Sequence, residues 1–375
     1  MNILYISCKK SWGGVASWMV KTAEALEQRG HKVFILSARH SFFTQNAPKS
    51  LRLIPWNFGV DYSLVTIFYI IYLIKKHRVN IVVTNIEKEI ACGGIAAKIC
   101  DVPNIRRVGR HDDFNDAKPK IRFRHERFVT TSVAPCGAVW REALSHSPWL
   151  SDYPFTTIYN GRDPVRSDSK SVAALRESWG IDKTTIAIGT TSRLNGEKRI
   201  DLIIGAYVAA LPKIRAPSAL VICGSGKMET SLKAFCASLG AANHIYFVGF
   251  TTNPQLAASA YDIALSAADN EGFPNSVVEY MAQGCATIAV DTGGVKEIVI
   301  DRENGLLIDK GDEKALTDKI IMLANDAALR KKLGKAAQKR VMESFSEATM
   351  IDRFEAFYQE AATASRSKKS PQKRD

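Results

Sequence analysis

Two carboxylates lie close to a predicted helix start in the second half of the chain. Glu271 and Glu279 are separated by the seven residues Gly-Phe-Pro-Asn-Ser-Val-Val, and an apolar helical pattern follows. Pro274 favours the first turn of this helix, where its missing N–H would have no intrahelical partner. The amides at residues 275–277, together with the helix dipole, would then bind an anion such as a phosphate. A loop and a core helix with two solvated glutamates is the alternative interpretation.

Two cations follow a predicted strand at residues 185–190. Arg193 and Lys198 are five residues apart across a turn that leads into a helix. A planar guanidinium group and a compact ammonium group can converge on one diphosphate there. A basic helix entry without a ligand is the alternative. After the next predicted strand, Gly224 and Gly226 indicate a tight glycine turn.

The first half of the chain offers fewer candidate residues. Gly13 and Gly14 lie in the loop after the first predicted strand, where glycine lets the backbone approach a phosphate before a helix begins. A plain strand-to-helix turn would also explain them. His111 follows a later strand and could bind a sugar hydroxyl or hold a proton near neutral pH. An ordinary surface histidine is the alternative.

Common cofactor signatures are missing. The dinucleotide fingerprint Gly-x-Gly-x-x-Gly is absent, and Met228 follows Lys227 where a P-loop needs Ser or Thr. Asp112 and Asp113 lack the third ligand and the spacing of a metal site. We therefore predict neither a bound cofactor nor a metal ion.

Strands and helices alternate along most of the sequence, which predicts parallel sheets covered by helices on both faces. Ligands of such sheets bind at the carboxyl ends of the strands, where the candidate residues lie. The length of 375 residues exceeds one ordinary core, so two domains are expected. We place the domains at residues 1–166 and 167–345, a further helix at 346–360, and a disordered basic tail at 361–375.

The charge of the chain favours anionic ligands. The formal net charge is +13 and the isoelectric point is about 9.3. Such a protein could bind nucleic acid, anionic lipid or a phosphorylated ligand, and charge does not distinguish among them. The arginine-rich segment at 117–127 could contact nucleic acid or form a solvated basic face.

Cysteine usage and hydropathy suggest a location. The seven cysteines form no Cys-x-x-Cys pair, which favours reduced thiols in the cytosol over disulfides or a metal site. The N-terminal residues lack the features of a signal peptide. The apolar run at 64–74 is shorter than the ~20 residues of a membrane-spanning helix. It predicts a buried helix, although the basic residues at 75–78 leave a membrane-surface role open.

The order of these motifs resembles the retaining nucleotide-sugar glycosyltransferases of family 4, which have the GT-B fold. The resemblance covers nearly the whole chain. It includes Glu-x7-Glu with the residues Gly-Phe-Pro-Asn-Ser inside it, and the Asn-Gly-x-Asp segment at 160–163. Arg193 and Lys198 match the family pattern Gly-Arg-Leu-x-x-x-Lys-Gly. Ser192 and Arg199 replace its two glycines, which leaves the backbone path of this turn open but not its charge.

This resemblance implies two Rossmann-like domains that face each other across a cleft, with residues 346–360 crossing back to the first domain. It implies catalytic roles for Arg193, Lys198, Glu271 and His111, with Glu271 and His111 placing the donor sugar. It implies donor contacts at the following residues: Gly13, Gly14, Gly224, Gly226, Phe250, Gly272, Phe273, Pro274, Asn275, Ser276, Val277 and Glu279. GT-B enzymes generally use no bound metal.

The function that the resemblance implies is retaining transfer of a hexosyl or N-acetylhexosaminyl group. The donor would be a nucleoside diphosphate sugar and the acceptor a hydroxyl of a glycan or glycolipid. Synthesis of cell-envelope polysaccharide or lipopolysaccharide is the expected setting. The expected location is the cytoplasm, with a peripheral position at the inner face of the membrane left open. A GT-B-like nucleotide-sugar epimerase and a basic nucleic-acid-binding protein are the alternatives, although we expect no nucleic acid partner.

Overall fold

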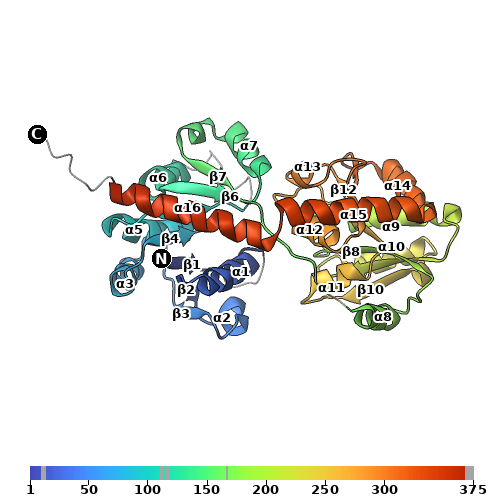
Figure 1. The fold of residues 1–375 in the computed structure, drawn as a ribbon, viewed down its shortest axis with the longest axis horizontal. Helices are drawn as coiled ribbons and strands as arrows, with labels where there is room; N and C mark the ends of the chain where they lie inside the picture. Colours follow the sequence, from blue (N-terminus) through green and yellow to red (C-terminus); the bar gives the residue numbers. More distant parts are fainter. Residues whose placement is uncertain (10–13, 110–113, 115–118, 166–167, 368–375) are drawn as a thin grey trace, which may run out of the picture. The chain divides into compact units, whose positions relative to one another are not determined.

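The computed structural model describes residues 1–9, 14–109, 114, 119–165 and 168–367, which divide into two units. The N-terminal unit contains Met1–Tyr159 and the chain from Met350 onward, and the C-terminal unit contains Asn160–Thr349. Each unit has its own parallel sheet with helices packed on it (Figure 1). The prediction of two Rossmann-like parallel-sheet domains is confirmed.

The sheet of the N-terminal unit has the strand order β3-β2-β1-β4-β5-β6-β7, and each neighbouring pair is parallel. Its strands are β1 (Asn2–Ser7), β2 (Lys32–Ala38), β3 (Arg52–Trp56), β4 (Ile81–Thr84), β5 (Asn104–Arg107), β6 (Thr131–Ala134) and β7 (Phe155–Thr157). The chain builds outward from β1 in one direction and then from β4 in the other. The strand order therefore reverses between β1 and β4, where doubly wound sheets bind their ligands.

The helices of this unit cover the two faces of its sheet. They are α1 (Gly14–Gln28), α2 (Phe42–Asn46), α3 (Leu64–Lys76), α4 (Glu87–Glu89), η1 (Ile90–Gly94), α5 (Ile95–Ile99), α6 (Pro119–Phe128), α7 (Gly137–His146), η3 (Pro148–Asp152) and α16 (Glu347–Ser367). Alternation along β1 separates two cores, because successive side chains of a strand face opposite sides. Ile3 and Tyr5 pack with α1 and α16, whereas Leu4 and Ile6 pack with α3 and the η1–α5 segment.

Helix α16 corrects the predicted C-terminal tail. It begins at Glu347 and continues to Ser367, so residues 361–367 are helical and not disordered. Its buried positions Phe354, Phe357, Tyr358 and Ala361 follow the i, i+3, i+4, i+7 spacing of a helix face. The alanine side chains at the end of this pattern are too small to signal burial in the sequence. The remainder of the predicted tail, residues 368–375, lies outside the described residues.

The boundary between the units also differs from the prediction. The division falls at Tyr159–Asn160, before the predicted position at residue 166. The segment after Asn160 packs on the C-terminal unit, where the backbone N–H of Arg162 donates to the Phe345 carbonyl over 2.8 Å. The chain therefore joins the second unit several residues earlier than the polar linker suggested.

The sheet of the C-terminal unit has the parallel strand order β10-β9-β8-β11-β12-β13. Its strands are β8 (Ile186–Thr191), β9 (Ser218–Cys223), β10 (Ile245–Gly249), β11 (Ile263–Ser266), β12 (Ala286–Val290) and β13 (Leu306–Ile308). Its helices are α8 (Ser169–Ser178), η4 (Gly196–Lys198), α9 (Ile200–Ala210), η5 (Leu211–Lys213), α10 (Glu229–Ser238), η6 (Ala242–His244), α11 (Pro254–Ser259), α12 (Asn275–Ala282), α13 (Val295–Ile298), α14 (Glu313–Asn325) and α15 (Ala327–Ser344).

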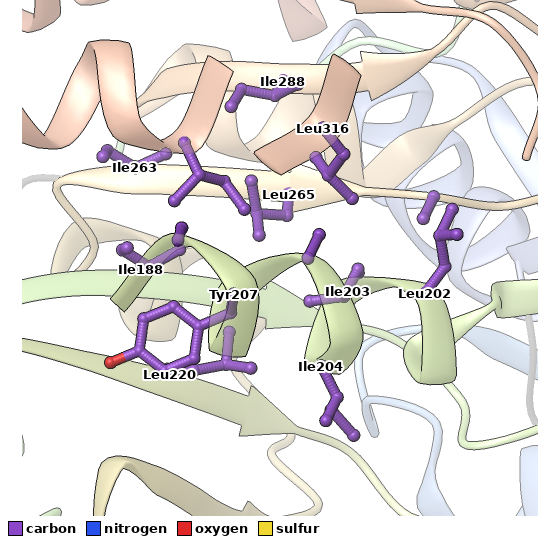
Figure 2. Close-up of a cluster of buried hydrophobic side chains, with 14 of the residues drawn as sticks. Ile188, Leu202, Ile203, Ile204, Tyr207, Leu220, Ile263, Leu265, Ile288 and Leu316 are labelled. Atoms are coloured by element: carbon purple, nitrogen blue, oxygen red, sulfur yellow. The ribbon is translucent and has the colours of Figure 1, made fainter. Parts of the chain in front are cut away.

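The main core of this unit lies between the sheet and helices α9 and α14. Figure 2 shows Ile203 and Tyr207 of α9 among the branched side chains of the central strands, which include Ile188 and Leu265. The Tyr207 hydroxyl donates to the Ser218 carbonyl over 2.9 Å, so the buried ring keeps a hydrogen bond for its polar end. This core holds the carboxyl ends of β8 and β11 in fixed positions, and both strands lead into candidate site loops.

Helix α3 is buried on one face only, whereas the apolar run at 64–74 predicted a buried helix. Ile67, Ile70, Leu73 and Ile74 face the core, while other large apolar side chains of the helix are exposed. Among the helices that the structure describes, none is both long and apolar enough to cross a membrane.

Candidate active site

Lys198 and Glu271 are brought together at the carboxyl edge of the second sheet. Lys198 ends η4 after β8, and Glu271 lies in the loop between β11 and α12. The Lys198 ammonium forms an ion pair with Glu271 Oε1, and both side chains are largely buried. Together with Ser276 they line one small cavity. The structure thus unites two of the four predicted catalytic residues in one site.

The N-terminus of α12 lies beside this ion pair. Pro274 immediately precedes the first helical residue, Asn275, instead of lying inside the first turn. The Asn275 amide donates to the Phe273 carbonyl over 3.0 Å, so it is not available as predicted. Within the described part of the chain, no acceptor bonds the amides of Ser276 and Val277. Two of the three expected amides therefore remain available for an anion at this positive helix end.

Glu279 lies in the second turn of α12 and pairs with an arginine that the sequence did not identify. Its Oε1 accepts from Arg162 Nε over 2.9 Å, and the two side chains are only 10% and 8% exposed. Arg162 Nη2 also donates to Asn275 Oδ1 over 3.3 Å, and the Asn160 side-chain amide donates to the same oxygen over 3.1 Å. Arg162 thus fixes both the carboxylate and the first residue of the helix.

The signal for Arg162 was its position inside the Asn-Gly-x-Asp segment. Gly161 packs against the backbone of Ser346, so the neighbouring Arg162 is buried with it. A buried charged side chain needs a partner of opposite charge. A Cβ added at Gly161 would lie 2.3 Å from the Ser346 carbonyl oxygen, so this segment packs tightly. The sequence separation of 117 residues from Glu279 hid the pair.

Gly224 and Gly226 have a structural reason for being glycines. Gly224 has φ +149°, and a Cβ there would lie 1.8 Å from the Ser192 carbonyl oxygen. A Cβ at Gly226 would lie 2.2 Å from the Leu194 carbonyl oxygen. Backbone N–H groups of Ser192 and Leu194 donate to the carbonyls of Cys223 and Ser225. The glycine turn therefore supports the loop that carries Arg193.

The other predicted residues of this unit have different surroundings. Arg193 is exposed, and among the described residues no ion pair joins it to Glu271. Phe250 follows β10 and is 72% exposed. Phe273 is buried, and its ring lies 6.4 Å from that of Phe345, so its side chain belongs to the core. Only its backbone remains a candidate for ligand contact.

Gly272 is held by a second glycine turn that was not among the predicted site residues. Its carbonyl accepts from the Gly294 amide over 3.0 Å. Gly293 has φ +50°, and a Cβ there would lie 1.6 Å from the Glu271 carbonyl oxygen. The backbone of Glu271 is therefore fixed by direct contact with this turn.

Arg199 adopts the left-handed conformation that explains the glycine of the family pattern. Its φ and ψ are both 47°, and it separates η4 from α9. A residue with a Cβ pays roughly 1–2 kcal/mol for this conformation. Its guanidinium group pairs with Asp201 at 3.1 Å and with Asp269 at 3.4 Å. These contacts tie the Lys198 turn to the loop that carries Glu271.

The N-terminal unit contributes fewer described site residues. Gly13 and His111 lie outside the described residues, and Gly14 begins α1. At the end of β1, the buried Glu89 accepts from the backbone amide of Cys8 at 2.9 Å, and it also accepts from the amide of Asn85 at 2.7 Å. It thereby joins the loops after β1 and β4, where the strand order reverses. Burial raises the pKa of Glu89, while the amide donors lower it.

A buried basic cluster joins β5 and α6 in the same unit. Arg106 is paired with Glu87 at 2.9 Å and lies 4.1 Å from the centre of the Phe114 ring. His125 packs among aromatic rings beside it. Burial, with a smaller contribution from the Arg106 charge, lowers the pKa of His125 from its ordinary value of 6.5 to about 3. His125 is therefore a neutral core histidine near pH 7.

Two family models match consecutive parts of this chain. Residues 171–340 match the family described as Glycosyl transferases group 1, and residues 12–166 match Glycosyltransferase Family 4. The first match contains the Lys198, Glu271 and Glu279 site. The second contains the loop after β5 and begins within the loop after β1.

Curated relatives are similar to about half of the chain, and the match spans about half of their own length. EpsD of Bacillus subtilis, named as a glycosyltransferase, is 34% identical over 185 residues, which are 49% of this chain and 48% of EpsD. A Campylobacter jejuni enzyme is 29% identical over 184 residues, 49% of this chain and 48% of its own length. Its name is N-acetylgalactosamine-N,N'-diacetylbacillosaminyl-diphospho-undecaprenol 4-alpha-N-acetylgalactosaminyltransferase.

A solved structure is similar over almost the whole chain. Alr3699/HepE of Anabaena, solved in complex with UDP, superimposes with a TM-score of 0.83 at 18% identity. The match covers 96% of this chain and all of that one. At this identity the likeness supports the shared fold.

Proposed function

Because the chain belongs to the group 1 glycosyl transferases of family 4, we propose that it transfers a sugar from a nucleoside diphosphate sugar to an acceptor hydroxyl. The observation that carries this proposal is the ion pair of Lys198 and Glu271 beside the available amides of Ser276 and Val277. A cation, two amides and a helix dipole at one place suit a diphosphate.

Charge development explains how this site would accelerate transfer. The diphosphate gains negative charge as its bond to the sugar stretches. Lys198 and the amides of Ser276 and Val277 then stabilise the transition state more than the bound donor. Arg193, exposed on the same loop, adds positive charge. Donor binding has to separate Lys198 from Glu271 in part, which frees the carboxylate for a sugar hydroxyl.

The other carboxylate has a different role in this proposal. Glu279, oriented by Arg162, binds the ribose hydroxyls through the oxygen that Arg162 does not hold. Glu271 and His111 orient the donor sugar. We assign no carboxylate as a nucleophile, and we propose retention through attack on the face that the diphosphate leaves. No bound metal takes part, so EDTA should leave the rate unchanged.

The acceptor and donor classes are inferred from the relatives. The Campylobacter enzyme carries a diphospho-undecaprenol acceptor in its name, and the Anabaena structure contains UDP. We propose a hexosyl or N-acetylhexosaminyl group as the transferred sugar and a glycan or glycolipid of the cell envelope as the acceptor. The enzyme would work in the cytoplasm at the inner face of the membrane.

Lys198→Ala tests the proposed leaving-group role. We expect kcat to fall about 100-fold or more, since a preorganised charge at the leaving group is removed. Release of nucleoside diphosphate is measured with a set of UDP-, GDP- and ADP-sugars, and thermal melting checks the fold. Lys227→Ala is the matched control, because Lys227 is an exposed lysine of a neighbouring loop.

Two outcomes would contradict the proposal. A Lys198→Ala enzyme with ordinary turnover would remove Lys198 from the mechanism. Conversion of the donor alone into its epimer would identify an epimerase. NMR of the product anomeric configuration tests retention separately.

A further inference from the structure

Helix α3 presents a continuous apolar stripe to solvent. Leu64, Phe68 and Tyr72 are spaced by four residues and are 68%, 66% and 51% exposed. Val65, beside Leu64, is 70% exposed. Residues four apart lie on one helix face, so these side chains form a single surface. Isolated exposed apolar residues are ordinary, but a contiguous group on a helix held by the fold indicates an interaction site.

The stripe continues into aromatic and apolar neighbours at both sides. Val60, in the loop before the helix, is 76% exposed. The rings of Trp56 and Tyr69 stack with centres 3.9 Å apart, and Tyr69 lies 6.1 Å from Tyr72. Tyrosine and tryptophan combine an apolar ring with a polar group, which suits the boundary between lipid and water.

Basic residues border one end of this surface. Lys75 and Lys76 occupy the last turn of α3 and are exposed, and Arg78 follows them. The Lys76 ammonium lies 5.3 Å from the centre of the Tyr72 ring. Helix α3 contains no acidic residue. The nearby Asp61 is paired with Arg124 at 2.7 Å, so its charge is compensated.

We propose that this surface, defined by Val60, Leu64, Val65, Phe68, Tyr72, Lys75 and Lys76, docks the protein on an anionic lipid bilayer. The apolar side chains would enter the boundary between headgroups and acyl chains, while the lysines contact anionic headgroups. A second copy of the chain is a poorer partner, because two such surfaces would bring their lysines together in a protein of net charge +13.

The proposal refines the membrane location given under Proposed function, but it does not depend on sugar transfer. Lipid binding and donor turnover are measured separately, so either can fail without the other. Flotation of the full chain with vesicles needs no donor. Nucleoside diphosphate release needs no vesicles.

The test compares vesicles of phosphatidylglycerol and phosphatidylcholine with vesicles of phosphatidylcholine alone. We expect the wild-type chain to float with the anionic vesicles. The double variant Leu64→Ser with Phe68→Ser should lower the partition coefficient at least about tenfold, since each buried apolar side chain contributes to binding. Lys75→Gln with Lys76→Gln should lower it about fivefold for each lysine.

Matched controls use the other unit. Met322→Ser with Met342→Ser replaces two apolar side chains that are 49% and 50% exposed. Lys331→Gln with Lys332→Gln replaces two exposed lysines of α15. Both controls should float as the wild type does. Neutralising Lys368, Lys369, Lys373 and Arg374 should leave the effect of the α3 variants intact. Melting and donor hydrolysis verify that every variant is folded.

Three results would overturn the proposal. The first is a Leu64→Ser with Phe68→Ser variant that folds and still floats as the wild type does. The second is a wild type that fails to float with anionic vesicles. The third is a wild-type dimer in light scattering that becomes a monomer in this variant without any change in flotation, which would identify the stripe as a contact between two copies.

Discussion

The pair of Arg162 and Glu279 gives the sharpest test of how this site is built. Arg162→Met removes the cation and keeps most of the side-chain volume. Glu279 would then be a carboxylate only 10% exposed without its partner. Removal of one member of a buried pair costs about 3 kcal/mol. For a unit of this size we expect the melting temperature to fall by about 6–12 °C.

The same change should act on the donor in a characteristic way. Glu279 would lose its orientation and Asn275 would lose one donor, so the KM of the donor should rise about tenfold. The kcat should change little, because a ribose contact is made equally in the ground state and the transition state. Removing the ribose 2′-hydroxyl from the donor should raise the KM more for the wild type than for Arg162→Met, because the variant has already lost part of the contact to that hydroxyl.

A double-mutant cycle separates the pair from its surroundings. Glu279→Gln is combined with Arg162→Met, and we expect a coupling free energy on the order of 2 kcal/mol in the free energy of unfolding. The double variant should recover stability relative to Arg162→Met but should not recover donor affinity. Arg176→Met is the matched control, because Arg176 pairs with Asp262 in the same unit at 3.3 Å. It should affect stability and leave the KM unchanged. The reasoning is refuted if Arg162→Met changes neither melting nor KM, or if the two single effects simply add.

Two further predictions concern backbone strain and buried charge. Arg199→Ala should be less stable than Arg199→Gly by about 1 kcal/mol, because both lose the pairs with Asp201 and Asp269 but only glycine relieves the left-handed conformation; equal denaturation midpoints would contradict this. His125, with its pKa lowered to about 3, favours the neutral form in the folded state. The stability that this contributes is complete above pH 6.5 and is lost as the pH falls toward 3, by at most about 1.4 kcal/mol per pH unit. His125→Phe should flatten the dependence of the melting temperature on pH in this range, and a slope as steep as that of the wild type would show that other groups control it.

Short-range patterns in the sequence were sufficient for the fold class and for part of the site. Alternating apolar strands and helices predicted two parallel sheets, because burial on both faces requires that pattern. The spacing of Glu271, Pro274 and Glu279 predicted a loop followed by a helix, and α12 begins at Asn275. Lys198 and Glu271 were each assigned to loops at strand ends. Parallel topology then brings such loops to the same edge of the sheet.

Contacts between distant segments were decided only by the tertiary structure. The partner of Glu279 comes from a segment 117 residues earlier, and a single sequence contains no distance between them. Residues 224 and 293 have to be glycine because a Cβ there would collide with a carbonyl oxygen of another loop. The local conformational propensity of a residue does not reveal such a contact. Helix α16 extends to Ser367 because small alanines find a buried face.

The exposed face of α3 is another feature that the tertiary structure decided and the sequence alone did not. Its sequence is mostly apolar up to Ile74, which predicts a buried helix, but hydrophobicity alone does not state how many faces of a helix find neighbours. The sheet of its unit covers one face, and no described element covers Phe68 or Leu64. The sequence determined that these residues form a helix and that basic residues follow. Packing decided which of them meet solvent, because burial depends on the neighbours that the whole fold supplies.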